Sequence, residues 1–176
     1  MTSLIVTFVG PDRPGLVSAL ADRAAEHGAN WTDSIMANFA GQFAGIVQLQ
    51  ASAERCNLLI AALQAMELSD ARIQIVRTDD VQKLTTMRRL QLDLVGQDRP
   101  GILHGISSEL ARCSVSIEKL QTFVASGAMS GEQMFHLSAQ LSVPTTLNTE
   151  SLRAGLESLA NELMVDITFD SGQSHD

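Results

Sequence analysis

The chain has 176 residues, of which 45% are hydrophobic and 4% aromatic, and its formal net charge is -8. This length fits one large domain or two small ones, and the apolar fraction is sufficient for a buried core of aliphatic side chains. The acidic charge argues against direct binding of nucleic acid, whose phosphates it would repel. The two cysteines, Cys56 and Cys113, are too few for a disulfide framework.

The first half of the chain alternates between strand-like and helix-like patterns. Apolar, β-branched or alternating runs predict four strands, over residues 4–9, 31–39, 42–51 and 72–76. Helical periodicity predicts two helices, over residues 14–27 and 53–66. Pro14 is expected in the first turn of the first helix, where its missing N–H costs nothing, and Gly28 is expected to end that helix. The apolar stripe of this helix is expected to comprise Val17, Leu20, Ala21 and Ala24.

The heptapeptide Val-Gly-Pro-Asp-Arg-Pro-Gly at residues 9–15 recurs at residues 95–101 as Val-Gly-Gln-Asp-Arg-Pro-Gly. The offset of 86 residues is the size of a whole small domain, so duplication is the economical explanation. The second half repeats the order of elements, with strands expected over residues 90–95, 115–124, 134–143 and 164–169. Its helices are expected over residues 100–112 and from a cap at Asn148 or Thr149.

Each half therefore has the order βαββαβ, for which the compact solution is two helices on one face of a four-stranded antiparallel sheet. The predicted fold class is α+β, with two tandem ferredoxin-like domains over residues 1–78 and 88–170. The polar segment 79–87 is expected to be a linker, and residues 171–176 a flexible tail.

The N-terminal apolar run is not preceded by basic residues, and Gly10 and Pro11 end it far short of a membrane-spanning length. It therefore predicts a first strand rather than a secretion signal or a membrane anchor. With two unpaired cysteines, the sequence is typical of a cytoplasmic protein. The histidines and cysteines show no ligand spacing, so neither a metal nor another cofactor is expected.

The repeated Asp-Arg-Pro-Gly loop allows two interpretations. Asp12 is expected to cap the following helix by accepting the N–H of Gly15, and Asn30, at the start of the second strand, is expected nearby with a donor and an acceptor. A helix N-terminus carries partial positive charge and unpaired N–H groups, which can hold the carboxylate of a free amino acid. The other interpretation is that these residues are simply favourable for a strand-to-helix turn.

The pattern Asp-x-Pro-Gly-Leu/Ile after a first strand, followed by a helix and a Gly-x-Asn turn, resembles that of the ACT domain. ACT domains are βαββαβ modules that bind amino acids and regulate enzymes or transcription. The resemblance implies that the ligand contacts in the first copy are Asp12, Arg13, Pro14, Gly15, Leu16 and Asn30. The matching residues of the second copy are Asp98, Arg99, Pro100, Gly101 and Ile102, with Ser116 in the place of Asn30. Because serine is shorter and lacks amide donors, ligand binding is expected mainly in the first copy.

Two ACT-like domains without a catalytic domain resemble the tandem ACT-domain transcriptional regulators of glycine cleavage. This resemblance implies a non-enzymatic protein that responds to glycine or another small amino acid. It also implies that the chain acts on a LysR-type activator rather than on DNA, and that it forms a homodimer through sheet edges or faces. Neither nucleic acid nor a membrane is expected as a partner.

Three alternatives start from the same fold. Acylphosphatases use an Arg in the first loop and an Asn on the second strand, which Arg13 and Asn30 match, although Pro14 deprives the loop of a phosphate-binding N–H. A regulatory subunit of a separate metabolic enzyme would also need no catalytic residues. RNA-binding domains of this topology stack bases on sheet aromatics, but without a basic patch the core is the better place for Phe8, Phe43 and Phe135.

Overall fold

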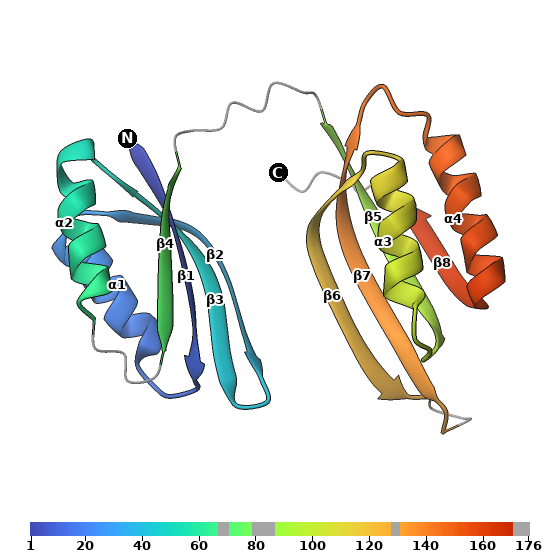
Figure 1. Ribbon diagram of the computed structural model, residues 1–176, viewed down its shortest axis with the longest axis horizontal. Coiled ribbons are helices and arrows are strands. Elements are labelled where there is room, and N and C mark those ends of the chain that lie inside the picture. Colours follow the sequence, from blue (N-terminus) through green and yellow to red (C-terminus); the bar gives the residue numbers. More distant parts are fainter. Residues whose placement is uncertain (67–70, 79–86, 128–130, 171–176) are drawn as a thin grey trace. The chain divides into compact units, whose positions relative to one another are not determined.

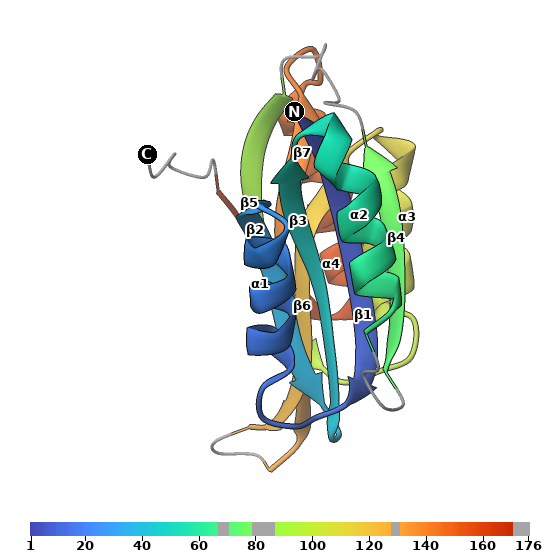
Figure 2. The ribbon, with the colours of Figure 1, turned by 90° about the vertical axis from the view of Figure 1, so that its left-hand side faces the viewer.

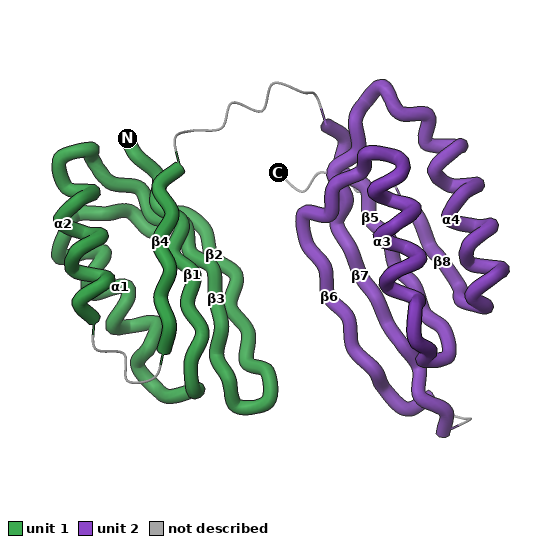
Figure 3. The backbone as a smooth tube through the Cα atoms, in the orientation of Figure 1, with its two compact units in different colours: residues 1–82 green, residues 83–176 purple. Residues whose placement is uncertain are grey.

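The computed structural model describes residues 1–66, 71–78, 87–127 and 131–170 (Figure 1). The chain forms two compact units, residues 1–82 (unit 1) and residues 83–176 (unit 2), which Figure 3 colours separately. Most of the expected linker and all of the expected tail lie outside the described residues. Met87, which was assigned to the linker, is the first residue of a strand.

Unit 1 has the predicted order strand, helix, strand, strand, helix, strand. Its strands are β1 (Thr2–Pro11), β2 (Asn30–Phe39), β3 (Gln42–Ala51) and β4 (Arg72–Thr78). Its helices are α1 (Leu16–Glu26) and α2 (Ala53–Gln64). The strands form one antiparallel sheet in the order β2-β3-β1-β4, so β2 and β4 are its edges.

Unit 2 repeats this arrangement. Its strands are β5 (Met87–Gln97), β6 (Ser116–Ser126), β7 (Gln133–Pro144) and β8 (Val165–Asp170). Its helices are α3 (Ile102–Arg112) and α4 (Thr149–Leu163). The sheet has the equivalent order β6-β7-β5-β8 and is antiparallel throughout. The predicted fold, two tandem ferredoxin-like α+β domains, is confirmed.

In each unit the two helices cover the same face of the sheet; Figure 2 shows α1 and α2 side by side over the strands of unit 1. Successive residues of a strand point to opposite faces, so every second residue of β1 and of β5 is buried beneath the helices. On β1 these residues are Leu4, Val6 and Phe8, and on β5 they are Leu90, Leu92 and Leu94. The cores are largely aliphatic, as the composition predicts.

Helix α1 begins at Leu16 and not at Pro14, so the expectation that proline would occupy the first turn is wrong. Pro14 lies in the preceding turn, and Gly15 is the N-cap residue with a left-handed backbone, φ +93°. The buried stripe of the helix consists of Leu16, Leu20 and Ala24, with Leu16 at its first position. Two residues of the expected stripe, Val17 and Ala21, are therefore exposed. Helix α3 has the matching stripe Ile102, Ile106 and Leu110.

Other local predictions hold. Ala40 and Gly41 both have positive φ, which is typical of the tight hairpin turn expected between β2 and β3. Asn148 caps α4 by accepting the N–H of Glu150 at 2.9 Å. The edge strands carry a feature that was not predicted, a β-bulge in β2 at Thr32 and an equivalent one in β6 at Glu118.

The cores predict a sharp contrast between two adjacent leucines of α2. Leu59 is completely buried, whereas Leu58 is 63% exposed. We expect Leu59→Ala to lower the free energy of unfolding by about 2–5 kcal/mol, because it removes buried methyl groups and leaves a cavity. Leu58→Ala should change it by less than about 0.5 kcal/mol. Urea unfolding of the full chain, followed by circular dichroism, measures both; equal effects would contradict the assigned helix face.

Candidate functional site

The loop between β1 and α1 is held against the β2–β3 hairpin turn. The backbone N–H of Asp12 donates to the carbonyl oxygen of Gly41 at 2.9 Å. The side-chain amide of Asn38 donates to the Asp12 carboxylate, with 2.6 Å between Nδ2 and Oδ2. The same Asn38 accepts the Gly41 N–H at 3.3 Å. Asn38 thus connects the loop to the turn, a role that the sequence analysis missed; its position just before the Ala-Gly turn was the available signal.

Asp12 does not cap α1, contrary to prediction. A capping side chain belongs to the N-cap residue itself, and in α1 that residue is Gly15, which has no side chain. Gly101 occupies the same place before α3, with φ +99°. In neither helix does the N-cap residue supply a side-chain cap. In both helices the first-turn N–H groups therefore receive no cap from the N-cap residue, and these groups carry the positive end of the helix dipole.

Asn30 does not lie near this loop, so the expectation that the two would form one site within a domain is wrong. The strand register pairs Asn30 with Gln50, and Gln50 in turn with Ser3 of β1. Ser3 is separated from Asp12 by roughly 30 Å of extended strand. Ser116 of unit 2 lies at the same far end, because it is paired through Ser142 with Arg89 at the start of β5. The register thus separates Asn30 and Ser116 from the other predicted site residues.

The second loop is built differently from the first. The N–H of Asp98 donates to Gln133 across the sheet end at 2.8 Å, which reproduces the backbone contact of unit 1. The residue in the place of Asn38, however, is Val124, which has no polar side-chain atom and cannot bind the carboxylate. The guanidinium of Arg99 instead donates to the side chain of Gln97 at 3.1 Å. Asp, Arg, Pro and Gly are the same in both loops, but their surroundings are not.

Outside the two loops, an acidic side chain of unit 2 has a perturbed pKa. At the end of α3 a hydrogen bond from the Arg112 guanidinium, 2.6 Å from Oε1 of Glu109, lowers the pKa of Glu109 against the opposing effect of its burial. This ion pair joins residues of one helix, away from the loop of residues 98–101.

No group of three or more potential metal-ligating side chains occurs in the described part of the chain. None of the described helices is long and apolar enough to cross a membrane.

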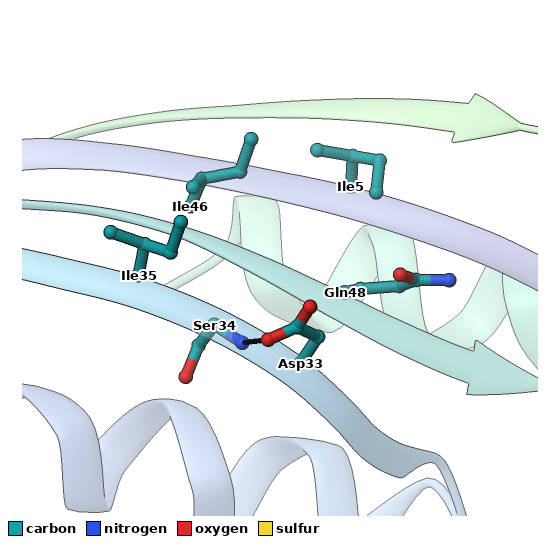
Figure 4. Close-up of a pocket in the computed structure, with 6 residues that line it drawn as sticks. All are labelled: Ile5, Asp33, Ser34, Ile35, Ile46 and Gln48. Atoms are coloured by element: carbon teal, nitrogen blue, oxygen red, sulfur yellow. Dashed lines mark hydrogen bonds between the residues drawn. The ribbon is translucent and has the colours of Figure 1, made fainter. Parts of the chain in front are cut away.

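A shallow hollow lies on the face of the unit 1 sheet that the helices leave open (Figure 4). Its volume is about 170 Å³, and it is lined by Ile5, Asp33, Ser34, Ile35, Ile46 and Gln48. Asp33 follows the bulge in β2, and its carboxylate accepts the N–H of Ser34 at 2.8 Å. The sequence analysis did not predict this surface, because it treated the strands by their inward-facing residues.

The chain belongs to the ACT domain family. The family model matches it twice, over residues 2–75 and 88–170, which correspond to the two sheets with their helices. None of the functionally curated protein sequences is significantly similar to the chain.

Two solved structures share the tandem arrangement over nearly their whole length. A protein of unknown function from Galdieria sulphuraria is 26% identical with a TM-score of 0.86, over 98% of this chain and 99% of its own. A protein provisionally described as a glycine cleavage system transcriptional repressor is 19% identical with a TM-score of 0.69, over 96% of each chain. Both similarities cover the two domains of this chain and not one domain alone.

The left-handed glycines predict a backbone effect that is independent of packing. A Cβ built on Gly15 meets no atom within 4 Å, so any cost of substitution comes from φ alone. We expect Gly15→Ala to lower the free energy of unfolding by about 1–2 kcal/mol. Gly15→Asn should cost less, because asparagine tolerates the left-handed region. Thermal unfolding of the two variants tests this order, and an alanine variant as stable as the parent would show that the turn can adopt another backbone.

Proposed function

We propose that the chain is a non-enzymatic regulatory protein that senses a small amino acid at the β1–α1 loop of unit 1. The observation that carries this proposal is the start of α1, where the N-cap Gly15 leaves the first turn without a cap of its own and the loop before it holds the Asp12 carboxylate on Asn38. A site for an amino-acid zwitterion needs a positive group that binds the carboxylate and a negative group that binds the ammonium. A helix N-terminus supplies the positive end, and a carboxylate supplies the negative end.

In this site the ligand carboxylate accepts hydrogen bonds from the first-turn N–H groups of α1, and the ligand ammonium is held by Asp12. Asn38 fixes the Asp12 carboxylate at 2.6 Å, which lowers the entropic cost of binding. Arg13, Pro14, Gly15 and Leu16 shape the turn. Asn30 does not contact such a ligand within unit 1, because the register of its sheet places it at the far end.

The same proposal assigns a weaker role to unit 2. Asp98, Arg99, Pro100, Gly101 and Ile102 form the equivalent loop, and α3 likewise begins without a side-chain cap. Val124 replaces the asparagine that orients the carboxylate in unit 1. We therefore infer that unit 1 binds the amino acid more tightly, and that unit 2 serves mainly as a scaffold.

Family membership and the tandem relative support a proposal for the regulatory target. Because that relative is described as a repressor of glycine cleavage, we infer that glycine is the first ligand to test and that the chain controls glycine-cleavage genes from the cytoplasm. We propose that it acts as a homodimer on a LysR-type activator and does not bind DNA itself. The net charge of -8 supports a regulator that works through protein contacts.

An acylphosphatase-like activity is not favoured by the geometry. That chemistry needs the loop arginine and the strand asparagine on one phosphate, whereas Asn30 lies at the sheet end opposite the loop that holds Arg13. The two residues therefore cannot contact the same acyl phosphate within one domain.

Thermal shift with the twenty amino acids tests the sensor. A ligand that binds only the folded state stabilises it by about 2.7 kcal/mol at a hundredfold excess over its dissociation constant. We expect glycine or another small amino acid to raise the unfolding temperature. Asp12→Asn should abolish the shift, because the neutral amide no longer attracts the ammonium group.

Asp98→Asn is the matched control, since it makes the same change in the loop of unit 2. It should leave most of the shift intact. If no amino acid shifts the transition, the sensor hypothesis fails and a module that binds only proteins remains. If the two variants lose the shift equally, the assignment of the ligand to unit 1 is wrong.

A further inference from the structure

The open face of the unit 1 sheet carries several exposed apolar side chains. Cross-strand partners point to the same face, and the register pairs Ile5 with Val76 and Ile46 with Ile35. Figure 4 shows Ile5, Ile35 and Ile46 on one side of the sheet, opposite the helices. Ile35 is 52% and Ile46 44% exposed. The exposed apolar side chains of this face are Val9, Ile35, Phe39, Ile46 and Val76.

Unit 2 shows that the fold does not require such a face. At the positions of the three isoleucines its equivalent face is polar: Gln91 stands in the place of Ile5, Gln121 in the place of Ile35 and Ser138 in the place of Ile46. The exposed apolar side chains of this face are Val95 and Phe123, and the Phe123 ring stacks on His136. Gln91 donates to Ser138 at 2.8 Å, so this face forms its own polar contacts. The inward-facing residues, in contrast, are apolar in both units. A contiguous apolar surface that folding does not need is typical of an interface.

We propose that the open face of unit 1 packs against the same face of a second copy of this chain. This inference rests on the homodimer of the proposed function and assigns its surface. The unit 2 face has polar side chains where unit 1 has isoleucines, so it does not match the isoleucine patch, whereas a second unit 1 offers an identical patch. Such an interface is isologous, so each contact occurs twice.

The two charged residues of the face support this partner. Asp33 lies on β2 at the level of Ile5, and Arg72 lies on β4, paired with Val9. They stand at diagonally opposite corners, about 13 Å apart along the strands and about 14 Å apart across them. A twofold axis perpendicular to that diagonal places Asp33 of one copy over Arg72 of the other, twice. The strands of the two sheets then cross near 90°, one of the two preferred geometries of sheet packing.

The first experiment is sedimentation equilibrium of the full chain, with substitutions taken from unit 2. Ile35→Gln combined with Ile46→Ser installs the residues with which the equivalent sheet already folds, and circular dichroism verifies the fold. We expect the parent to be a dimer and the double variant to dissociate at least about a hundredfold more readily, since each buried isoleucine contributes about tenfold. Leu58→Gln, an exposed leucine on α2, is the control and should leave the dimer unchanged.

The second experiment exchanges the charges. Asp33→Lys, which introduces the residue found as Lys119 at the equivalent bulge, and Arg72→Glu should each weaken the dimer. The double exchange should restore it, because the pairs form again with reversed sign. Failure of the double exchange to restore the dimer would overturn the orthogonal arrangement.

A monomeric parent would overturn the homodimer and this interface together. A dimer that withstands the isoleucine substitutions would overturn the interface alone. Neither result bears on the amino-acid thermal shift, so failure of the interface and failure of the sensor are distinguishable. A monomer that uses this face for a different protein would count against the proposal.

Discussion

The covering of each sheet by helices on one face alone is the constraint from which the other properties of the chain follow. Alternation along a strand divides its residues into an inward set and an outward set. The inward set must be apolar, since it forms the core beneath the helices, and it is apolar in both units. The outward set does not have to be apolar, and it differs between the two units. Strands β1 and β3 present isoleucines at the positions where β5 and β7 present Gln91 and Ser138.

Much of the fold could be predicted from the sequence, because strand alternation, helical periodicity and turn residues are local signals. The order of the twelve elements and the Ala-Gly hairpin turn are of this kind. The start of α1 was misplaced because proline is common in the first turn of a helix, whereas here the left-handed backbone of Gly15 delays the helix by two residues beyond Pro14. The expected apolar stripe also contained Val17 and Ala21 and omitted Leu16, whereas Leu16 is buried and the other two are exposed.

The site was harder to predict, because it depends on where the chain lies in space. Asn30 was expected near Asp12, but the helix between them returns the chain to the far end of the sheet; eleven helical residues span about 16 Å. The true neighbour of Asp12 is Asn38, which comes from the other end of the same strand. Strand register determines both the distance of Asn30 from Asp12 and the contact between Asn38 and Asp12. No single sequence motif encodes that register.

The bulges in β2 and β6 have a consequence for assembly. A regular edge strand presents an even row of N–H and C=O groups, to which another chain can add and extend the sheet without limit. The extra residue, Thr32 in β2 and Glu118 in β6, breaks the spacing of that row at one point. A further strand cannot then pair in register along the whole of this edge. The bulges thus disfavour open-ended growth of the sheet through β2 and β6. Association through a sheet face does not carry this hazard, because it adds no strand to an edge.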